Sequence, residues 1–299
     1  MSQEKDKKNQ NLMHLIKRVH SVVEHTDIDK HRQSQNYFGV LMGNSREIKV
    51  KAANIYGMHA EWVRPKRPHR KRKAILYCHG GGYSTGSCLY ARSLTTKLAV
   101  ASGMDVLGFD YRLAPEHPFP AAVGDVERAW NYLMLLGYGA RDVIVAGDSA
   151  GGNLALVLVH KLKKEGRLLP GGLALMSPWT DLTASGKSYQ AKRDVDPVLN
   201  QEYLNEMIHN YVGEKHLENP LVSPLFGDFS KFPPTYIQVG ENEILLSDSL
   251  LLEEKLKAAG VQARIDVFEG MWHVFQMSRL KIAQEAIDRM AEFTFEILG

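Results

Sequence analysis

Cysteine is scarce in this sequence, and its scarcity limits the kinds of site the chain can hold. Only Cys78 and Cys88 occur in 299 residues. Two cysteines at this spacing resemble neither a disulfide framework nor a metal-binding motif. Cys78 lies in an apolar run, so we expect it to be a core residue. We therefore expect a reducing, cytoplasmic compartment.

Long apolar runs are also missing. No segment approaches the roughly eighteen unbroken apolar residues that a membrane span needs. The N-terminus begins with charged residues, and the apolar pair Leu15-Ile16 is followed at once by Lys17-Arg18. It has no continuous apolar region and no small-residue cleavage site, so it does not match a signal peptide. We expect no stable membrane insertion.

An excess of one charge is likewise absent. The net charge of +3 is too small to indicate a nucleic-acid partner by itself. The basic residues gather in 64–73, and a run of this kind suits a phosphate backbone or an anionic surface. Its two prolines and its lack of interleaved aromatics favour a solvated loop between two strands. We therefore expect no nucleic-acid partner.

Apolar periodicity predicts the secondary structure. Residues 11–40 have the spacing of an amphipathic helix, which we expect to pack on the protein rather than on a membrane. From about residue 46 the pattern changes to strands, the first two antiparallel, followed by alternating strands and helices. This alternation predicts a mostly parallel sheet covered by helices on both faces. The expected strands are Ile48–Ala52, Met58–Val63, Ala74–Cys78, Asp105–Phe109, Asp142–Ala146, Gly172–Met176, Thr235–Val239 and Ala263–Phe268, and the expected helices cover 90–102, 121–136, 150–165, 246–259 and 279–297.

One segment interrupts the alternation. Residues 185–220 contain no convincing strand, and 198–212 have helical spacing. An insertion between late strands of such a sheet is a natural lid, which the N-terminal helices would complete. The predicted organisation is an N-terminal helical cap segment over 1–45 and an α/β domain over 46–299, with a cap insertion at about 185–220.

Gly147-Asp148-Ser149-Ala150-Gly151 matches the pattern G-x-S-x-G. It follows an apolar strand and opens an apolar helix, which is the strand–turn–helix context that a nucleophile elbow requires. In that context Ser149 is exposed on a tight turn, and the backbone N–H of Ala150 is free to face an oxyanion. The alternative is a serine that merely caps a buried helix.

His79-Gly80-Gly81-Gly82-Tyr83 follows the strand that ends at Cys78. Glycines leave the backbone N–H groups of Gly81 and Gly82 unobstructed, as in the HGGG-type loop that supplies oxyanion-hole donors. We expect His79 itself to be structural. A phosphate-binding loop is the alternative, but the G-x-G-x-x-G and lysine–serine signatures are absent.

These two motifs, in this order, resemble the hormone-sensitive-lipase family of α/β-hydrolases, and its bacterial esterases in particular. Further matches are 110–122 (DYRLAPEHPFPAA), 177–179 (SPW) and 219–225 (NPLVSPL). The similarity runs from about residue 40 to the end. It implies the α/β-hydrolase fold with a helical cap. It also implies a serine carboxylesterase that hydrolyses short-chain acyl esters through an acyl-enzyme, with Gly81, Gly82 and Ala150 as the oxyanion hole.

Chain order then selects the other members of a catalytic triad. In α/β-hydrolases the acid follows the serine and the histidine follows the acid. Only His273, in the loop after strand Ala263–Phe268, fits the base. The acid should follow strand Thr235–Val239, where Glu241, Glu243 and Asp248 are candidates. Because the sequence resembles a branch whose acid is a glutamate at this position, we favour Glu243. We expect Asp110, Arg112 and Glu116 to lock the loop after a central strand through buried hydrogen bonds.

Other functions use the same machinery. An amidase, a deacetylase and a lipase share the fold and triad, because specificity resides in the shape of the pocket. A non-catalytic small-molecule receptor on this fold would lack a triad member, whereas Ser149, Glu243 and His273 are all present. We expect a small-molecule ester as substrate and neither a metal nor an organic cofactor. The sequence leaves the natural ester open, and a homodimer is compatible with it.

Overall fold

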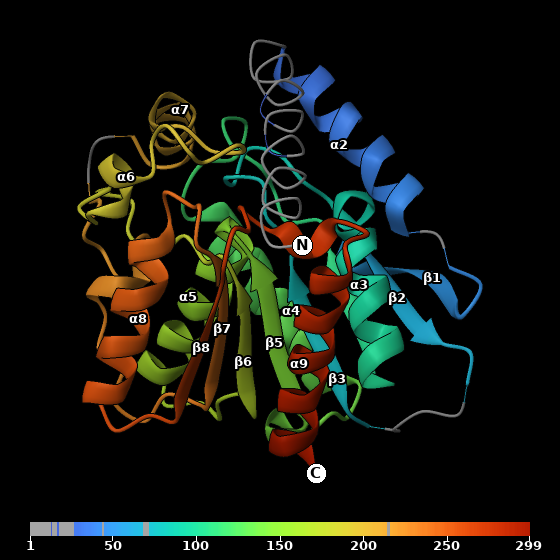
Figure 1. Cartoon of the computed structure of the whole chain (residues 1–299). Coiled ribbons are helices and arrows are strands. Elements are labelled where there is room, and N and C mark those ends of the chain that lie inside the picture. The colour runs from blue at the N-terminus through green and yellow to red at the C-terminus, as the bar shows by residue number, and fades with distance from the viewer. Residues whose placement is uncertain (1–12, 14–16, 18–26, 44, 68–71, 214–215) are drawn as a thin grey trace.

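An eight-stranded sheet forms the centre of the protein (Figure 1). The computed structural model describes residues 13, 17, 27–43, 45–67, 72–213 and 216–299. Within the sheet the strand order is β1-β2-β4-β3-β5-β6-β7-β8, and β2 runs antiparallel to both of its neighbours while the pairs from β4 to β8 are parallel. The strands are β1 (Ile48–Ile55), β2 (Met58–Pro65), β3 (Ala74–Cys78), β4 (Asp105–Phe109), β5 (Val143–Asp148), β6 (Gly172–Met176), β7 (Thr235–Gly240) and β8 (Ala263–Phe268).

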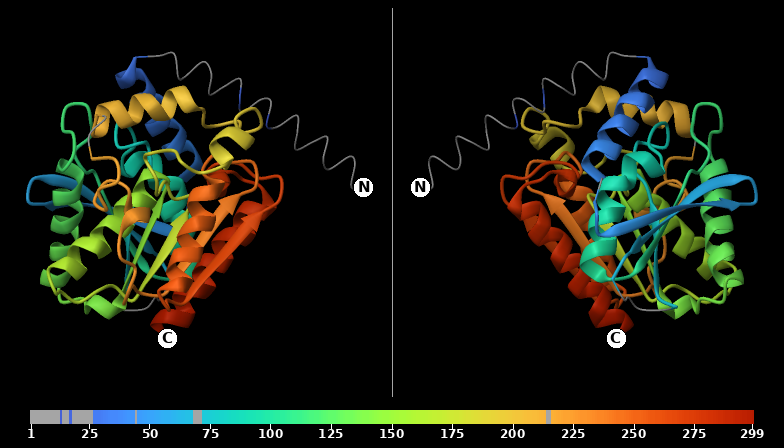
Figure 2. Two further views of the ribbon diagram at one scale, coloured as in Figure 1. Left: turned by 90° about the vertical axis from the view of Figure 1, so that its left-hand side faces the viewer. Right: turned by 90° about the vertical axis from the view of Figure 1, so that its right-hand side faces the viewer.

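Helices cover both faces of the sheet, as the alternating pattern predicts (Figure 2). On one face lie α3 (Cys88–Ser102) and α9 (Lys281–Leu298), which contact one another. On the other lie α4 (Ala121–Leu135), α5 (Ala150–Lys164) and α8 (Leu246–Ala258). Strands β3, β5 and β6 are buried along their whole length. Burial on both faces explains why these strands are continuous apolar runs rather than alternating ones. The predicted fold class is confirmed.

Three further helices lie beyond the carboxyl ends of the parallel strands (Figures 1 and 2). They are α2 (Ile28–Gly43), α6 (Ser188–Ala191) and α7 (Gln201–Tyr211). The ring of His31 on α2 packs against Tyr203 on α7, with centroids 6.0 Å apart. Of the helix predicted over 11–40, residues 11–12, 14–16 and 18–26 lie outside the described residues, and α2 covers 28–40. The division into a cap segment and an α/β domain stays a prediction.

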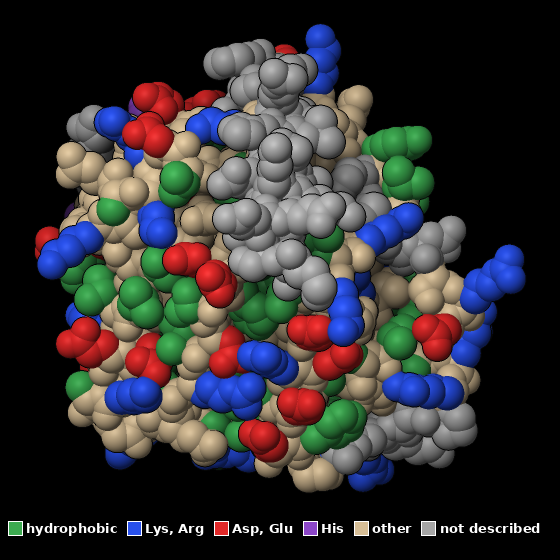
Figure 3. Space-filling model, viewed as in Figure 1, with side chains coloured by type: hydrophobic (Ala, Val, Ile, Leu, Met, Phe, Trp, Pro, Cys, Tyr) green, Lys and Arg blue, Asp and Glu red, His purple; other side chains and the backbone are tan. Residues whose placement is uncertain are grey.

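Residues 66–73 of the basic run lie between β2 and β3, Arg64 and Pro65 end β2, and residues 68–71 lie outside the described part. Arg64 forms an ion pair with Asp105 (3.0 Å) and lies over the ring of Trp62 (4.8 Å). On the face seen in Figure 3, acidic and basic side chains are interspersed. None of the helices within the described residues combines the length and apolarity needed to cross a membrane.

Candidate active site

Ser149 occupies the turn between β5 and α5. Its backbone has φ 54° and ψ −122°, a strained conformation for a residue other than glycine. Gly151 permits this turn, because a Cβ there would lie 2.1 Å from the carbonyl oxygen of Cys78. The side chain of Ser149 makes no capping hydrogen bond to α5, so the helix-cap alternative does not describe it. The local geometry is that of a nucleophile elbow.

Asp148, inside the same motif, connects the elbow to the glycine loop. Its carboxylate is fully buried and accepts hydrogen bonds from Tyr77 Oη (2.6 Å), Tyr90 Oη (3.0 Å) and the backbone N–H of Gly80 (3.0 Å). Burial raises the pKa of Asp148, and these hydrogen bonds oppose the rise. The sequence analysis missed this residue, since the motif allows any side chain there and the three donors come from other parts of the chain.

The glycine loop is held in conformations that suit glycine. Gly81 has φ 113° and Gly82 has φ 59°. A Cβ on Gly81 would lie 2.4 Å from the carbonyl oxygen of Thr85. Within the described part of the chain, the backbone N–H groups of Gly81, Gly82 and Ala150 donate to no acceptor. Unpaired donors in a nearly closed site are available to a ligand oxygen.

His79 is in contact with the glycine loop and with the loop after β4. Its Nδ1 lies 2.8 Å from the carbonyl oxygen of Gly80, and its ring stacks on Tyr111 at 4.1 Å between centroids. Burial lowers its pKa, which keeps the ring neutral. This matches the structural role expected from the sequence.

Glu243 and His273 meet in loops at the ends of β7 and β8. Glu243 Oε2 lies 2.9 Å from His273 Nδ1, and both side chains are buried. The other carboxylate oxygen accepts hydrogen bonds from Ser177 Oγ (2.7 Å) and from the backbone N–H of Gly240 (2.5 Å). Ser177 Oγ in turn accepts from the N–H of Val274 (3.2 Å). One hydroxyl therefore fixes both the carboxylate and the loop that carries the imidazole.

Electrostatics favour the protonated form of His273. Burial alone would lower its pKa, but the hydrogen bond that His273 donates to Glu243 and the negative charges of Glu243, Asp196 and Asp148 outweigh burial and raise it. A base with a raised pKa accepts a proton readily.

The other candidate carboxylates have other partners. Glu241 Oε2 accepts a hydrogen bond from the N–H of Gly270 (3.0 Å). Asp248 lies in α8, as expected, and accepts from the N–H groups of Thr180 (2.7 Å) and Asp181 (2.9 Å). Burial raises the pKa of Asp248 to about 8. Of the three carboxylates proposed from the sequence, only Glu243 is hydrogen-bonded to His273 within the described residues.

The loop after β4 is locked, but only partly through buried bonds. Arg112 pairs with the buried Asp125 at 2.9 Å. Glu116 pairs with Arg32 of α2 at 2.7 Å, and its side chain is 51% exposed. The expectation of buried hydrogen bonds is therefore wrong for Glu116, since α2 approaches the loop at its solvent-facing side. This partner was not predictable from local pattern.

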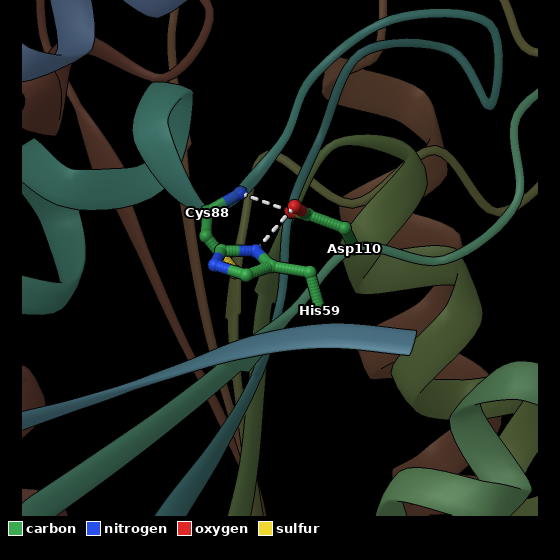
Figure 4. A group of neighbouring side chains, drawn as sticks. All are labelled: His59, Cys88 and Asp110. Carbon is green, nitrogen blue, oxygen red and sulfur yellow. Dashed lines mark hydrogen bonds and ion pairs between the residues drawn. The ribbon is translucent and has the colours of Figure 1, made fainter. Parts of the chain in front are cut away.

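Asp110 also belongs to a small cluster with His59 and Cys88, shown in Figure 4. One carboxylate oxygen accepts from the N–H of Cys88 (2.6 Å) at the start of α3, and the other lies 2.7 Å from His59 Nδ1. Burial raises the pKa of the Cys88 thiol well above its usual range. A metal ion would have to displace the hydrogen bond to His59 and deprotonate that thiol. In this cluster Asp110 therefore has two structural contacts. It accepts a hydrogen bond from the first N–H of α3, and it pairs with His59.

The insertion packs closely onto the glycine loop. Tyr83 stacks on Tyr211 of α7, with ring centroids 3.8 Å apart and planes 2° apart. The Tyr83 hydroxyl donates to Asn153 Oδ1 (2.7 Å), and the Asn153 amide donates to the carbonyl oxygens of Trp179 and Val222. The elbow helix and the glycine loop thus share a buried hydrogen-bond network with the segments on either side of the insertion, and the insertion contacts it through the ring of Tyr211.

Fold and site together define the class of protein. A strained serine after a central strand, a glycine loop with free N–H groups and a buried Glu–His pair on an α/β sheet are the parts of a serine hydrolase. Residues 75–277 match the family model for the alpha/beta hydrolase fold.

Known relatives narrow this class. The chain is 37% identical over 256 residues to an esterase of Acinetobacter venetianus, which covers 85% of this chain and 84% of the relative. It is 38% identical over 216 residues to an acetyl-hydrolase of Streptomyces hygroscopicus, covering 72% of each chain. The crystal structure of an esterase from the bacterial hormone-sensitive lipase family superposes with a TM-score of 0.93 at 35% identity, covering 98% of this chain and 99% of the other. The chain belongs to the hormone-sensitive-lipase family of α/β-hydrolases and is a serine ester hydrolase.

Proposed function

We propose that Ser149, His273 and Glu243 are the nucleophile, base and acid of an esterase acting on short-chain acyl esters. The observation that carries the proposal is the buried Glu243–His273 hydrogen bond of 2.9 Å, in a chain whose strained Ser149 follows the central strand β5. Glu243 orients the imidazole and stabilises its protonated form, so that the opposite ring nitrogen serves the serine.

The reaction proceeds by two acyl transfers. His273 accepts the proton of Ser149 Oγ while that oxygen attacks the ester carbonyl, and the N–H groups of Gly81, Gly82 and Ala150 stabilise the oxyanion. Collapse of the intermediate expels the alcohol, which takes the proton from His273. Water then attacks the acyl-enzyme by the same steps and releases the acid. No metal or organic cofactor takes part in this proposal.

The preference for short acyl chains rests on how the site is filled. Ser149 is only 8% exposed. The large side chains around the glycine loop are buried and packed together: Tyr83, Trp179, Met207 and Tyr211. Such packing leaves little room for a long acyl chain. The name of the Streptomyces acetyl-hydrolase points the same way.

The test is Ser149→Ala combined with a fluorophosphonate probe. The variant should fold, lose turnover of p-nitrophenyl acetate and lose labelling, while the wild type is labelled once per chain. Substantial turnover by the variant would mean that the nucleophile is another residue. Parallel assays with acetanilides would show whether amides are also cleaved, which is the amidase alternative.

We also propose a cytoplasmic location. Cys78 and Cys88 are both buried free thiols, a state that a reducing compartment maintains. Cell fractionation would test this, and light scattering would test the homodimer that the sequence permits.

A further inference from the structure

The insertion 185–220 holds the loop that carries Glu243 through both backbone polar groups of one residue, Ile244. The N–H of Ile244 donates to Asp196 Oδ2 (2.8 Å), and the carbonyl oxygen of Ile244 accepts from Ser188 Oγ (2.5 Å). Ile244 directly follows Glu243. Both of its backbone polar groups are therefore satisfied by side chains of the insertion, which restricts the rotation of the backbone next to the acid.

Asp196 is an unusual residue to bury for structural reasons alone. It is 2% exposed, and its other oxygen accepts from the N–H groups of Val198 (2.9 Å) and Leu199 (3.0 Å). Three backbone donors support the charged form, but within the described residues no lysine or arginine forms an ion pair with it. Burying a carboxylate without a cationic partner costs free energy, which the three backbone hydrogen bonds offset in part.

Asp196 interacts electrostatically with His273, the proposed base. His273 is its charged neighbour, and the acidic groups that face His273 are Glu243 at the end of β7, Asp148 at the end of β5 and Asp196 itself. Burial raises the pKa of Asp196 to about 6, and the charge of His273 opposes that rise. The carboxylate of Asp196 is thus negative near neutral pH. This is the pH range in which His273 would act as the base.

We propose that Asp196 is a positioning residue for the triad: it fixes the Glu243 loop through Ile244, and its negative charge stabilises the imidazolium of His273. This inference rests on the proposed roles of Ser149, Glu243 and His273. It makes the insertion part of the catalytic apparatus and not only a cover for the pocket. Asp196 touches neither substrate nor the reacting atoms.

The test compares Asp196→Asn with two matched controls. Asparagine keeps the shape and one acceptor oxygen but removes the charge. We expect kcat on p-nitrophenyl acetate to fall on the order of a hundredfold with KM unchanged, since displacement of a catalytic group by about 1 Å has effects of this size. The acid limb of the kcat/KM profile should also move to lower pH, because His273 loses a negative neighbour.

Ser188→Ala removes the second hold on Ile244 without changing charge, so it should lower kcat and leave the acid limb in place. Glu241→Gln removes a nearby carboxylate that contacts Gly270 instead, and it should change neither quantity. A folded Asp196→Asn protein with the wild-type kcat and acid limb would overturn the inference.

Should Asp196→Asn not fold, the wild type still decides the matter. The rate of fluorophosphonate labelling should fall on acidification more steeply than one titrating group allows, because Asp196 and His273 both take up protons as the pH falls below about 6. A slope of log rate against pH that stays at one down to pH 4 would overturn the inference. Failure of the proposed triad can be told apart from failure of the proposed role of Asp196. A wrong triad appears as surviving turnover in Ser149→Ala, and that result overturns both proposals.

Discussion

Replacing Gly82 with alanine separates backbone strain from catalytic geometry in the glycine loop. Gly82 has φ 59°, and an added Cβ would lie 2.7 Å from Cγ of Met207 on α7. Gly103, at the end of α3, has nearly the same φ, 63°, and a Cβ there would meet nothing within 4 Å. The two glycines thus share a positive φ, which an L side chain rarely adopts, and differ in what surrounds them.

The two substitutions should cost similar stability and very different activity. An alanine in the left-handed region costs about 1–2 kcal/mol. In a chain of this length that lowers Tm by only a few degrees. At Gly82 the added Cβ also clashes with the Met207 side chain, so both that side chain and the glycine loop must shift. The shift moves the N–H of Gly82 away from the oxyanion. Loss of one oxyanion-hole donor costs about 10²–10³ in kcat, or about 2.7–4 kcal/mol of transition-state stabilisation.

The assay measures kcat on p-nitrophenyl acetate and Tm by calorimetry for both variants. Gly103→Ala should keep wild-type kcat and show the drop in Tm. Gly82→Ala should show a comparable drop in Tm together with the loss of kcat. Wild-type kcat in Gly82→Ala would refute the argument, since its N–H would then not contribute to an oxyanion hole.

Three further predictions concern the acid, the base and the pocket. Glu243→Gln should lower kcat about 10⁴-fold. Asp248→Asn should change kcat little, because burial already raises the pKa of Asp248 to about 8 and its carboxyl group is then largely neutral. A large loss of kcat in Asp248→Asn would make Asp248 the acid instead of Glu243. The pKa of His273 is raised, and the base must be neutral to accept a proton. We therefore expect kcat/KM to decline on acidification with a midpoint above the ordinary histidine pKa of about 6.5. A midpoint below 6.5 would contradict the raised pKa of His273. Across p-nitrophenyl esters from acetyl to palmitoyl, kcat/KM should peak at short chains; a peak at long chains with activation at an oil–water interface would indicate a lipase.

The sequence by itself determined that a mostly parallel sheet forms and in what order strands and helices follow along the chain. It also determined the two motifs at 79–83 and 147–151. The period and the apolar runs are local properties, so β3 and β6 were predicted with the observed bounds and β5 to within two residues. The G-x-S-x-G turn was likewise predictable, because its backbone depends on glycines that lie next to the serine. Chain order and resemblance then limited the acid to three carboxylates.

Only the tertiary structure decided among those carboxylates and revealed what holds them. Glu243 and His273 lie 30 positions apart in sequence, and Asp196 lies 48 positions from Ile244. Asp148 likewise receives hydrogen bonds from Tyr77 and Tyr90, far away in the chain. These partnerships leave no periodic signal, because a buried carboxylate is satisfied by whichever donors the packed strands and loops bring within about 3 Å of it.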